Sequence, residues 1–423
     1  MMPSVTRILI TSMHYAPGAA GPGANVARIA EHLASRGYRV TVAAGLPLHP
    51  SFRAFAPYDG RPLREVRRGV LVRRVRHAIP RGGSVAGRVA ADASFFARGL
   101  SALQAPRPDA VLGFAPSVSS AMLARAAASR FRVPYGLVID APSAGDYADR
   151  WSASASDAAL GLAARAASVV AITDDEMRYP LEAHGVRPER IRRAAQWAHL
   201  PDAEADAGLV RQRLRVADDA VLCMYSGPLE RGLGLENLIY AAHMAQEMHP
   251  GWRFVIAGDG SRRRVLREML AWYGIRNTII IAPVPPEFLA AADVLVVPGA
   301  RAVGAMGAYL GAGRPIVAAS ERGESVAREI TASSCGIVVQ PEHPAALVRG
   351  VERTAADSAL KLYLTQAARR WAVTQRSESR AMQSYEQLVA AVLARGTHGR
   401  VHTEARERAR RDVPPAAMGR LAA

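Results

Sequence analysis

The stretch "VGAMGAYLGAGRPIVAA", Val303 to Ala319, decides the fold. Its first part is apolar and rich in small residues, which predicts a buried helix. Gly313 and Pro315 mark the end of that helix, because glycine commonly follows a helix and proline cannot continue one. The apolar run that follows predicts a buried strand. No acidic or basic residue precedes Arg314, so the stretch predicts a helix-to-strand unit without charged side chains of its own.

The same alternation of strand and helix extends over the chain in both directions. In the first half, "RILITSMHY", "ANVARIAEHLASRG" and "YRVTVAAGL" predict a strand, a helix ending near Gly37 and a second strand. In the second half the pattern restarts with "AVLCMYSGPL", "WRFVIAGDG", "NTIIIAP", "ADVLVVPG", "PIVAAS" and "CGIVVQP". This predicts an α/β protein with two doubly wound, mostly parallel sheets facing across a cleft.

Composition sets the domain boundaries and excludes several classes of protein. The expected units are residues 1–195, an Ala/Asp/Pro-rich linker at 196–212, a second domain at 213–393 and a basic, disordered or frayed helical tail at 394–423. Two separated cysteines exclude a disulfide framework and favour a cytoplasmic protein. No run approaches the ~20 apolar residues of a membrane-spanning helix.

The net charge of +17 favours anionic partners. Aromatic residues make up only 6% of the chain and do not alternate with basic ones, so nucleic acid is not an expected partner.

Glycine-rich turns between strands and helices are the first candidate binding elements. Glycine allows the backbone to approach a ligand, and a helix N-terminus favours an anion. The candidates are Gly21 and Gly23 after the first strand, and Gly227 with Arg231 after the strand near Met224. Plain tight turns, with Arg231 as a solvated charge, are the alternative.

Two carboxylates also follow buried strands. Asp259, between Gly258 and Gly260, either contacts a sugar hydroxyl or caps the basic helix that follows. Asp140 ends a strand of the first domain, where a carboxylate could accept a proton from a hydroxyl. Asp146 and Asp149 are alternatives to Asp140, and a helix cap is its structural alternative.

Eight arginines lie between Arg61 and Arg81. We expect them to form either a solvated hairpin or a surface for anionic lipid headgroups or an acceptor phosphate. The residues assigned to that contact are Arg67, Arg68, Arg73 and Arg74.

In their order and spacing these segments resemble the retaining glycosyltransferases of the GT-B class, family 4. The similarity spans Arg7 to Leu393 and is strongest to enzymes of exopolysaccharide and O-antigen synthesis, including colanic acid and fucosamine transferases. It is carried by "HYAPGAAGPGANVARIAEHLASRGYRV", "ARAASVVAITDDEMRYPLEAHGV", "SGPLERGLGLENLI", "FVIAGDG", "FLAAADVLVVP" and "YLGAGRPIVAA".

The resemblance implies a nucleotide-sugar donor in the C-terminal domain, with its diphosphate near Gly227–Gly234 and the helix start at Gly304 and Ala305. The base and ribose would lie near Gly258 and Val284. A glycan or polyprenyl-linked acceptor would enter from the N-terminal domain beside Asp140. No metal or other cofactor is expected. We do expect the protein to contact the inner face of the plasma membrane peripherally.

The sequence also departs from the family pattern. Two glutamates usual in the family fall on about Ala300 and Ala308, and the Pro-Ser-Lys triplet of the exopolysaccharide subgroup falls on Val303–Ala305. These absences leave three hypotheses open. They are an active transferase with an atypical donor site, a pseudo-enzyme that assists another transferase, and a sugar-nucleotide epimerase of the same fold.

Overall fold

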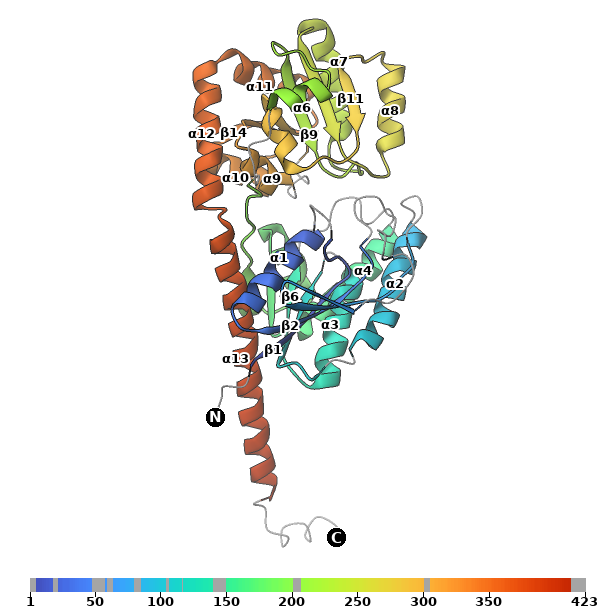
Figure 1. The fold of residues 1–423 in the computed structure, drawn as a ribbon, viewed down its shortest axis with the longest axis vertical. Helices are drawn as coiled ribbons and strands as arrows, with labels where there is room; N and C mark the ends of the chain where they lie inside the picture. The colour runs from blue at the N-terminus through green and yellow to red at the C-terminus, as the bar shows by residue number, and fades with distance from the viewer. Residues whose placement is uncertain are drawn as a thin grey trace.

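The computed structural model describes residues 5–17, 22–47, 58, 64–79, 85–103, 106–115, 117–139, 150–200, 207–299 and 305–411. Two α/β units lie one above the other, and a long C-terminal helix runs down beside the lower, first unit (Figure 1). Within the described residues, no helix is both long enough and apolar enough to cross a membrane.

The first unit contains an eight-stranded sheet in the order β3-β4-β2-β1-β5-β6-β7-β8, parallel except for the β3–β4 pair. Its strands are β1 (Arg7–Ser12), β2 (Arg39–Ala44), β3 (Arg64–Arg67), β4 (Val70–Arg74), β5 (Ala110–Phe114), β6 (Tyr135–Ile139), β7 (Val169–Ile172) and β8 (Ile191–Arg193). Its helices are α1 (Pro22–Ser35), α2 (Val85–Ala102), α3 (Val118–Phe131), α4 (Arg150–Ala166), α5 (Arg178–Ala183) and the 3₁₀ turns η1 (Asp175–Met177) and η2 (Pro188–Arg190).

The second unit contains a six-stranded parallel sheet in the order β11-β10-β9-β12-β13-β14. Its strands are β9 (Val221–Ser226), β10 (Trp252–Ala257), β11 (Thr278–Ile281), β12 (Val294–Val297), β13 (Ile316–Ala319) and β14 (Gly336–Val339). Its helices are α6 (Ala207–Arg213), α7 (Leu235–Met248), α8 (Arg263–Trp272), η3 (Pro286–Ala291), α9 (Met306–Ala312), α10 (Ser325–Ser333), α11 (Pro344–Ala356) and α12 (Ser358–Thr374).

The strands expected from apolar runs are therefore confirmed, and so is the two-sheet α/β fold. The runs form parallel strands because helices cover both faces, so that both sets of alternating side chains are buried. Residues 110–114, 135–139 and 294–297 are buried throughout.

The end of the second domain differs from the expected boundary at residue 393. Helix α13 (Glu378–Arg411) returns to the first unit, where Met382, Tyr385 and Val389 join the core formed by β1, β2, β5 and α1. The Arg28 guanidinium also makes two 2.9 Å hydrogen bonds to the Glu378 carboxylate. The chain thus crosses between the units twice, and residues 378–393 belong with the first.

The expected tail also begins inside α13, which continues as a helix to Arg411. The helical alternative therefore holds for residues 394–411, and residues 412–423 lie outside the described part of the chain. The connection between the units is short: Trp197 packs in the core of the first unit and Ala198 in the core of the second.

Candidate functional site

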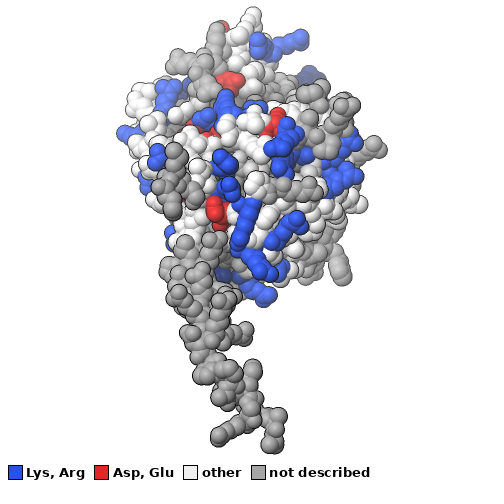
Figure 2. Space-filling model, turned by 60° about the horizontal axis from the view of Figure 1, so that its bottom comes forward, with Lys and Arg blue, Asp and Glu red and all other residues white. Residues whose placement is uncertain are grey.

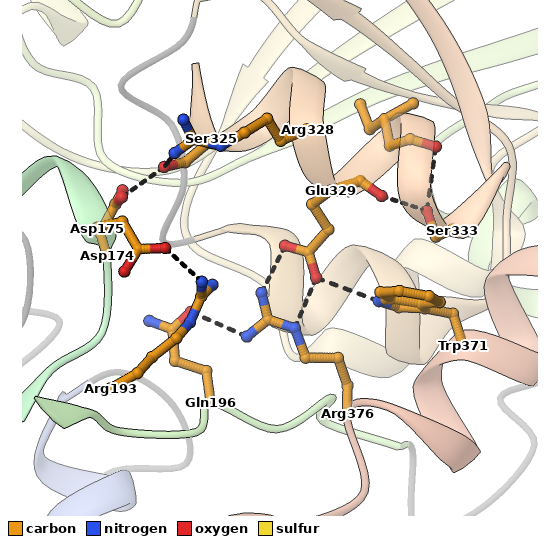
Figure 3. Close-up of polar contacts among 11 residues, drawn as sticks. Asp174, Asp175, Arg193, Gln196, Ser325, Arg328, Glu329, Ser333, Trp371 and Arg376 are labelled. Atoms are coloured by element: carbon orange, nitrogen blue, oxygen red, sulfur yellow. Dashed lines mark hydrogen bonds and ion pairs between the residues drawn. The ribbon is translucent and has the colours of Figure 1, made fainter. Parts of the chain in front are cut away.

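The carboxyl ends of the strands in the two sheets face one another. The turn η1, which follows β7, contacts the first turn of α10, which follows β13. The backbone N–H of Ser325 donates to Glu176 Oε1 at 3.0 Å, and the Ser325 hydroxyl donates to Asp174 (Figure 3). Carboxylates of the first unit therefore occupy the N-terminus of a helix in the second, which joins the two edges directly.

The second sheet has a topological switch point between β9 and β12. From β9 the chain proceeds to β10 on one side, and from β12 it proceeds to β13 on the other. In open α/β sheets ligands bind at this point, beyond the carboxyl ends of the strands. Tyr309 of α9 secures it, because its buried hydroxyl accepts from the Ser226 N–H at 2.9 Å and donates to Val296 O at 3.2 Å. Burial also raises the pKa of Tyr309, so its hydroxyl remains protonated.

Glycines bring the loops of this edge into backbone contact. A Cβ on Gly234 would overlap Pro298 O, and one on Gly299 would lie 2.9 Å from the Leu233 carbonyl carbon. The loops after β9 and β12 therefore touch beside the switch point. A Cβ on Gly258 would overlap the Gly227 carbonyl oxygen, and a Cβ on Gly260 would lie 2.5 Å from Leu229 O. The predicted glycines Gly227, Gly258 and Gly260 thus form one packed pair of loops.

The charged residues predicted in these loops have different surroundings. Arg231 is exposed and makes no ion pair with any residue that the structure describes. Asp259 instead accepts from the N–H of Gly260 at 2.9 Å and pairs with Arg263 at 3.5 Å. Asp259 therefore pairs with the first residue of α8 but does not cap this helix, whose N-cap is Arg262 without a side-chain hydrogen bond. Val284 is half-buried between β11 and η3 at the same edge.

Helix α9 begins where the sequence placed it. Ala305 is the half-buried N-cap of α9, whereas Gly304 lies outside the described residues. Gly307 and Gly311 face the connection between the units: a Cβ on Gly307 would lie 2.8 Å from Trp197 O, and one on Gly311 would overlap the His199 carbonyl. The absence of a side chain at these two glycines lets the interdomain connection pack directly against α9. The phosphate contact predicted at Gly304 and Ala305 concerns the residues just before these glycines and stays a prediction.

In the first unit, several predicted residues lie outside the described ranges: Gly21, Asp140, Asp146 and Asp149. Gly23 is described, and a Cβ there would lie 3.0 Å from Tyr15 N, so α1 begins in close contact with the chain after β1. Strand β6 ends at Ile139, the residue before Asp140 in the sequence.

A network of serine hydroxyls, not predicted from the sequence, lies at this edge. Ser120 Oγ accepts from the Met13 N–H at 2.8 Å and lies 2.7 Å from Ser117 Oγ, while the Ser119 hydroxyl donates to Asp92. The network joins the loop after β1 to the start of α3 and to α2. Serines near a helix start are common capping residues, so the sequence offered no specific signal for it.

The arginines predicted to contact a membrane are largely engaged within the protein. The side chain of Arg74 is fully buried, pairs with Glu65 at 2.8 Å and donates to the carbonyls of Ala16 and Gly45. Arg74 therefore cannot reach a bilayer, and its assignment is wrong. Its guanidinium lies 4.8 Å from the centre of the Tyr58 ring and closes the space beneath the loops after β1 and β2.

The other three arginines differ in their exposure. Arg67 and Arg68 pair with Glu31 of α1 at 3.7 and 3.2 Å, although the Arg68 side chain remains 67% exposed. The pKa of Arg73 is lowered by burial and by Arg64, and its Nε is buried without a partner in the described structure. Among the described residues there is also no cluster of His, Cys, Asp or Glu suited to a metal ion.

Two family models match the chain in succession. Residues 20–197 match the glycosyl transferase 4-like domain, and residues 208–371 match the glycosyl transferases group 1 model. One curated relative is the putative colanic acid biosynthesis glycosyl transferase WcaI of Escherichia coli, 25% identical over 64% of this chain and 70% of the relative.

Solved structures share the fold at low sequence identity. Sucrose-phosphate synthase of Thermosynechococcus elongatus has a TM-score of 0.71 at 18% identity, over 92% of this chain and 99% of that structure. HepE of Anabaena, solved in complex with UDP and glucose, has a TM-score of 0.68 at 16% identity, over 91% and 100% of the two chains.

Two facing doubly wound units with a switch-point site define the GT-B class of glycosyltransferase. With both family models matched in order, the chain belongs to the GT-B glycosyltransferases of family 4.

Proposed function

We propose that this protein transfers a sugar, with retention of anomeric configuration, from a nucleotide-sugar donor to a glycan or lipid-linked acceptor in cell-surface polysaccharide synthesis. The observation that carries the proposal is the β9–β12 switch point, where backbone-lined loops face the carboxyl edge of the first sheet. WcaI is named for colanic acid biosynthesis, and HepE was solved with UDP and glucose, which supports this class of donor and product.

The donor diphosphate would lie against the loops after β9 and β12. Arg231 has an exposed guanidinium that no described carboxylate neutralises, so it is available to balance the leaving group. Backbone N–H groups of the Gly227–Gly234 loop would supply further donors without a metal. Ser226 and Tyr309 hold the end of β9, and therefore the start of this loop, in place.

The acceptor would approach from the first unit. Asp140 follows the buried strand β6 and would orient the attacking hydroxyl, while the leaving diphosphate helps to remove its proton. The roles of Gly21, Gly23, Gly258, Asp259, Gly260, Val284, Gly304 and Ala305 in donor binding remain part of the same proposal.

One observation favours the second candidate function, a pseudo-enzyme that assists another transferase. Two glycines of α9, on the helix expected to face the diphosphate, pack against the interdomain connection, and the stretch Val303–Gly313 has no charged side chain. Nucleotide binding separates the two candidates, because a transferase must bind a donor whereas a scaffold need not.

Isothermal titration with UDP-, GDP- and dTDP-sugars tests the proposal. We expect one series to bind, and Arg231→Gln to weaken that binding by about tenfold, since a hydrogen bond to a charged group is lost. Arg264→Gln, on the exposed face of α8, is the matched control and should leave affinity unchanged. Absence of binding to every nucleotide would refute the transferase and favour the pseudo-enzyme.

Turnover of the bound donor then tests the acceptor side. Asp140→Ala should lower the transfer rate at least about tenfold with donor affinity nearly unchanged, as expected for loss of a group that positions or deprotonates the acceptor. Mass spectrometry of the product measures the rate. An unchanged rate would remove Asp140 from the mechanism.

We also infer peripheral contact with an anionic membrane, on the inner face of the plasma membrane. The face in Figure 2 carries many Lys and Arg side chains and few acidic ones. Exposed arginines at the amino edge of the first sheet include Arg7, Arg36, Arg39 and Arg68. Each basic side chain near an anionic bilayer contributes about 1 kcal/mol at moderate salt.

Co-sedimentation with vesicles tests this contact. Binding to vesicles with anionic lipid at low salt, its loss at high salt and its reduction by Arg36→Gln with Arg39→Gln are expected, because the attraction is screened. Equal binding to purely zwitterionic vesicles would contradict it.

A further inference from the structure

A cluster of basic side chains lies at the opposite edge of the second sheet, where β12 and β13 begin. Among the described residues, the carboxylate that forms ion pairs in this cluster is that of Asp293, which directly precedes β12. The Asp293 carboxylate accepts from Lys361 Nζ at 2.5 Å, from Arg211 Nη1 at 3.1 Å and from the Leu222 N–H at 2.8 Å. Both oxygens of Asp293 therefore already have charged partners.

Two further guanidinium groups in the cluster have no such partner. Arg314 precedes β13, and the stem of Arg369 from α12 crosses the neighbouring Gly313, where a Cβ would lie 2.5 Å from Arg369 Cγ. Neither side chain makes an ion pair with a residue in the described ranges, and the buried Nε of Arg314 has no hydrogen-bond partner there. Burial and the charge of Arg369 lower the pKa of Arg314.

In the described part of the chain, positive side chains outnumber negative ones in this cluster. Four cationic side chains, Arg211, Arg314, Lys361 and Arg369, belong to this cluster, and within the described residues Asp293 forms ion pairs with Arg211 and Lys361 alone. Like charges at close range repel, and a half-buried guanidinium without an acceptor loses the hydrogen bonds that water would provide. An oxyanion between Arg314 and Arg369 would remove both costs, because guanidinium groups bind phosphoryl oxygens in forked geometry.

We propose that Arg314 and Arg369 form a binding site for a phosphoryl group, separate from the donor site. The site lies at the amino edge of the second sheet, whereas the donor site lies at the carboxyl edge of the same strands. It connects the C-terminal end of α9 at Gly313 with α12, the helix that leads into α13. A bound phosphoryl group would therefore stabilise the second unit where the chain turns back towards the first.

Thermal unfolding with inorganic phosphate, compared with sodium chloride at equal ionic strength, tests the proposal. Phosphate should raise the midpoint of the wild-type protein, since a ligand of the folded state stabilises it by mass action. Arg314→Gln and Arg369→Gln should each weaken the apparent affinity by about tenfold or more. Arg370→Gln, the next residue on α12 and exposed, is the matched control and should retain the wild-type response.

Two further arms identify the ligand and its location. A sugar phosphate in place of inorganic phosphate distinguishes a phosphomonoester from the free ion: a larger shift assigns the site to the ester, and an equal one to the phosphoryl group alone. Saturating UDP should leave the phosphate response intact, which also separates this site from the proposed donor site.

Three results would overturn the proposal. They are a wild-type midpoint that phosphate raises no more than chloride does, an equal response in Arg369→Gln and wild type, and loss of the response when UDP is present. Because Arg369 is exposed on a helix surface, its variant keeps the test valid even if Arg314→Gln fails to fold.

Discussion

At the scale of single residues, the small side chains of α9 have a packing role that the sequence did not indicate. Gly307 and Gly311 are four residues apart and so lie on one face of the helix. That face receives the backbone of Trp197–His199, and the His199 N–H donates to Gly307 O at 3.0 Å. The interdomain connection therefore runs against bare helix backbone.

Gly311→Ala tests this role. The added methyl group would overlap the His199 carbonyl, so we expect a loss of about 1–3 kcal/mol in the free energy of unfolding, measured with denaturant. Gly323→Ala is the control, because a Cβ there meets no atom within 4 Å. Equal stability of the two variants would contradict the assigned contact.

At the scale of elements, apolar runs predicted the central strands but not the sheet edge. Strand β3 is half-exposed and carries the letters "REVR", which have no apolar run, and it forms only because β4 pairs with it at the edge. Arg74 in β4 shows most clearly where prediction from the sequence failed. Its sequence context is a basic segment, yet the strand turns this side chain inward, where Glu65 on β3 compensates its charge.

Arg74→Met tests the structural role of that ion pair. Removing one member of a buried pair typically costs about 3–5 kcal/mol, because the remaining charge is left unpaired. Arg68→Met, in the β3–β4 turn and largely exposed, should change stability by less than about 1 kcal/mol. Chemical denaturation measures the free energy of unfolding of both variants. A small loss for Arg74→Met would contradict a buried, paired Arg74.

At the scale of the whole molecule, α13 and a group of polar contacts join the two units. Arg376 Nε donates to Glu329 at 2.6 Å, and Arg376 Nη1 donates to Gln196 of the connection at 3.1 Å (Figure 3). Ser325 is held by Asp174 and Glu176 across the interface. These contacts fix how the carboxyl edges of the two sheets face one another, and so the space between donor and acceptor sides.

Ser325→Ala combined with Glu176→Gln should loosen that arrangement without unfolding either core. The contact with Glu176 is exposed, the contact with Asp174 is partly buried, and a hydrogen bond contributes about 1 kcal/mol net, so the expected change is a larger radius of gyration by small-angle X-ray scattering. Ser333→Ala is the control, because its hydroxyl bonds to Glu329 O and Ile330 O of α10 and, in the described part of the chain, to no residue of the first unit. An unchanged radius in the double variant would argue against the contact as a restraint on domain position.

The sequence by itself determined the two parallel sheets, the glycine loops and the positions of the loops at their carboxyl ends. Those features depend on local periodicity and on backbone freedom, which neighbouring residues encode. Only the tertiary structure decided that α13 belongs to the first unit, that Arg74 is buried, that Gly307 and Gly311 face the connection and that Arg314 and Arg369 share an unneutralised site. Each of these depends on contacts between residues far apart in the chain, and burial and charge compensation are properties of those contacts.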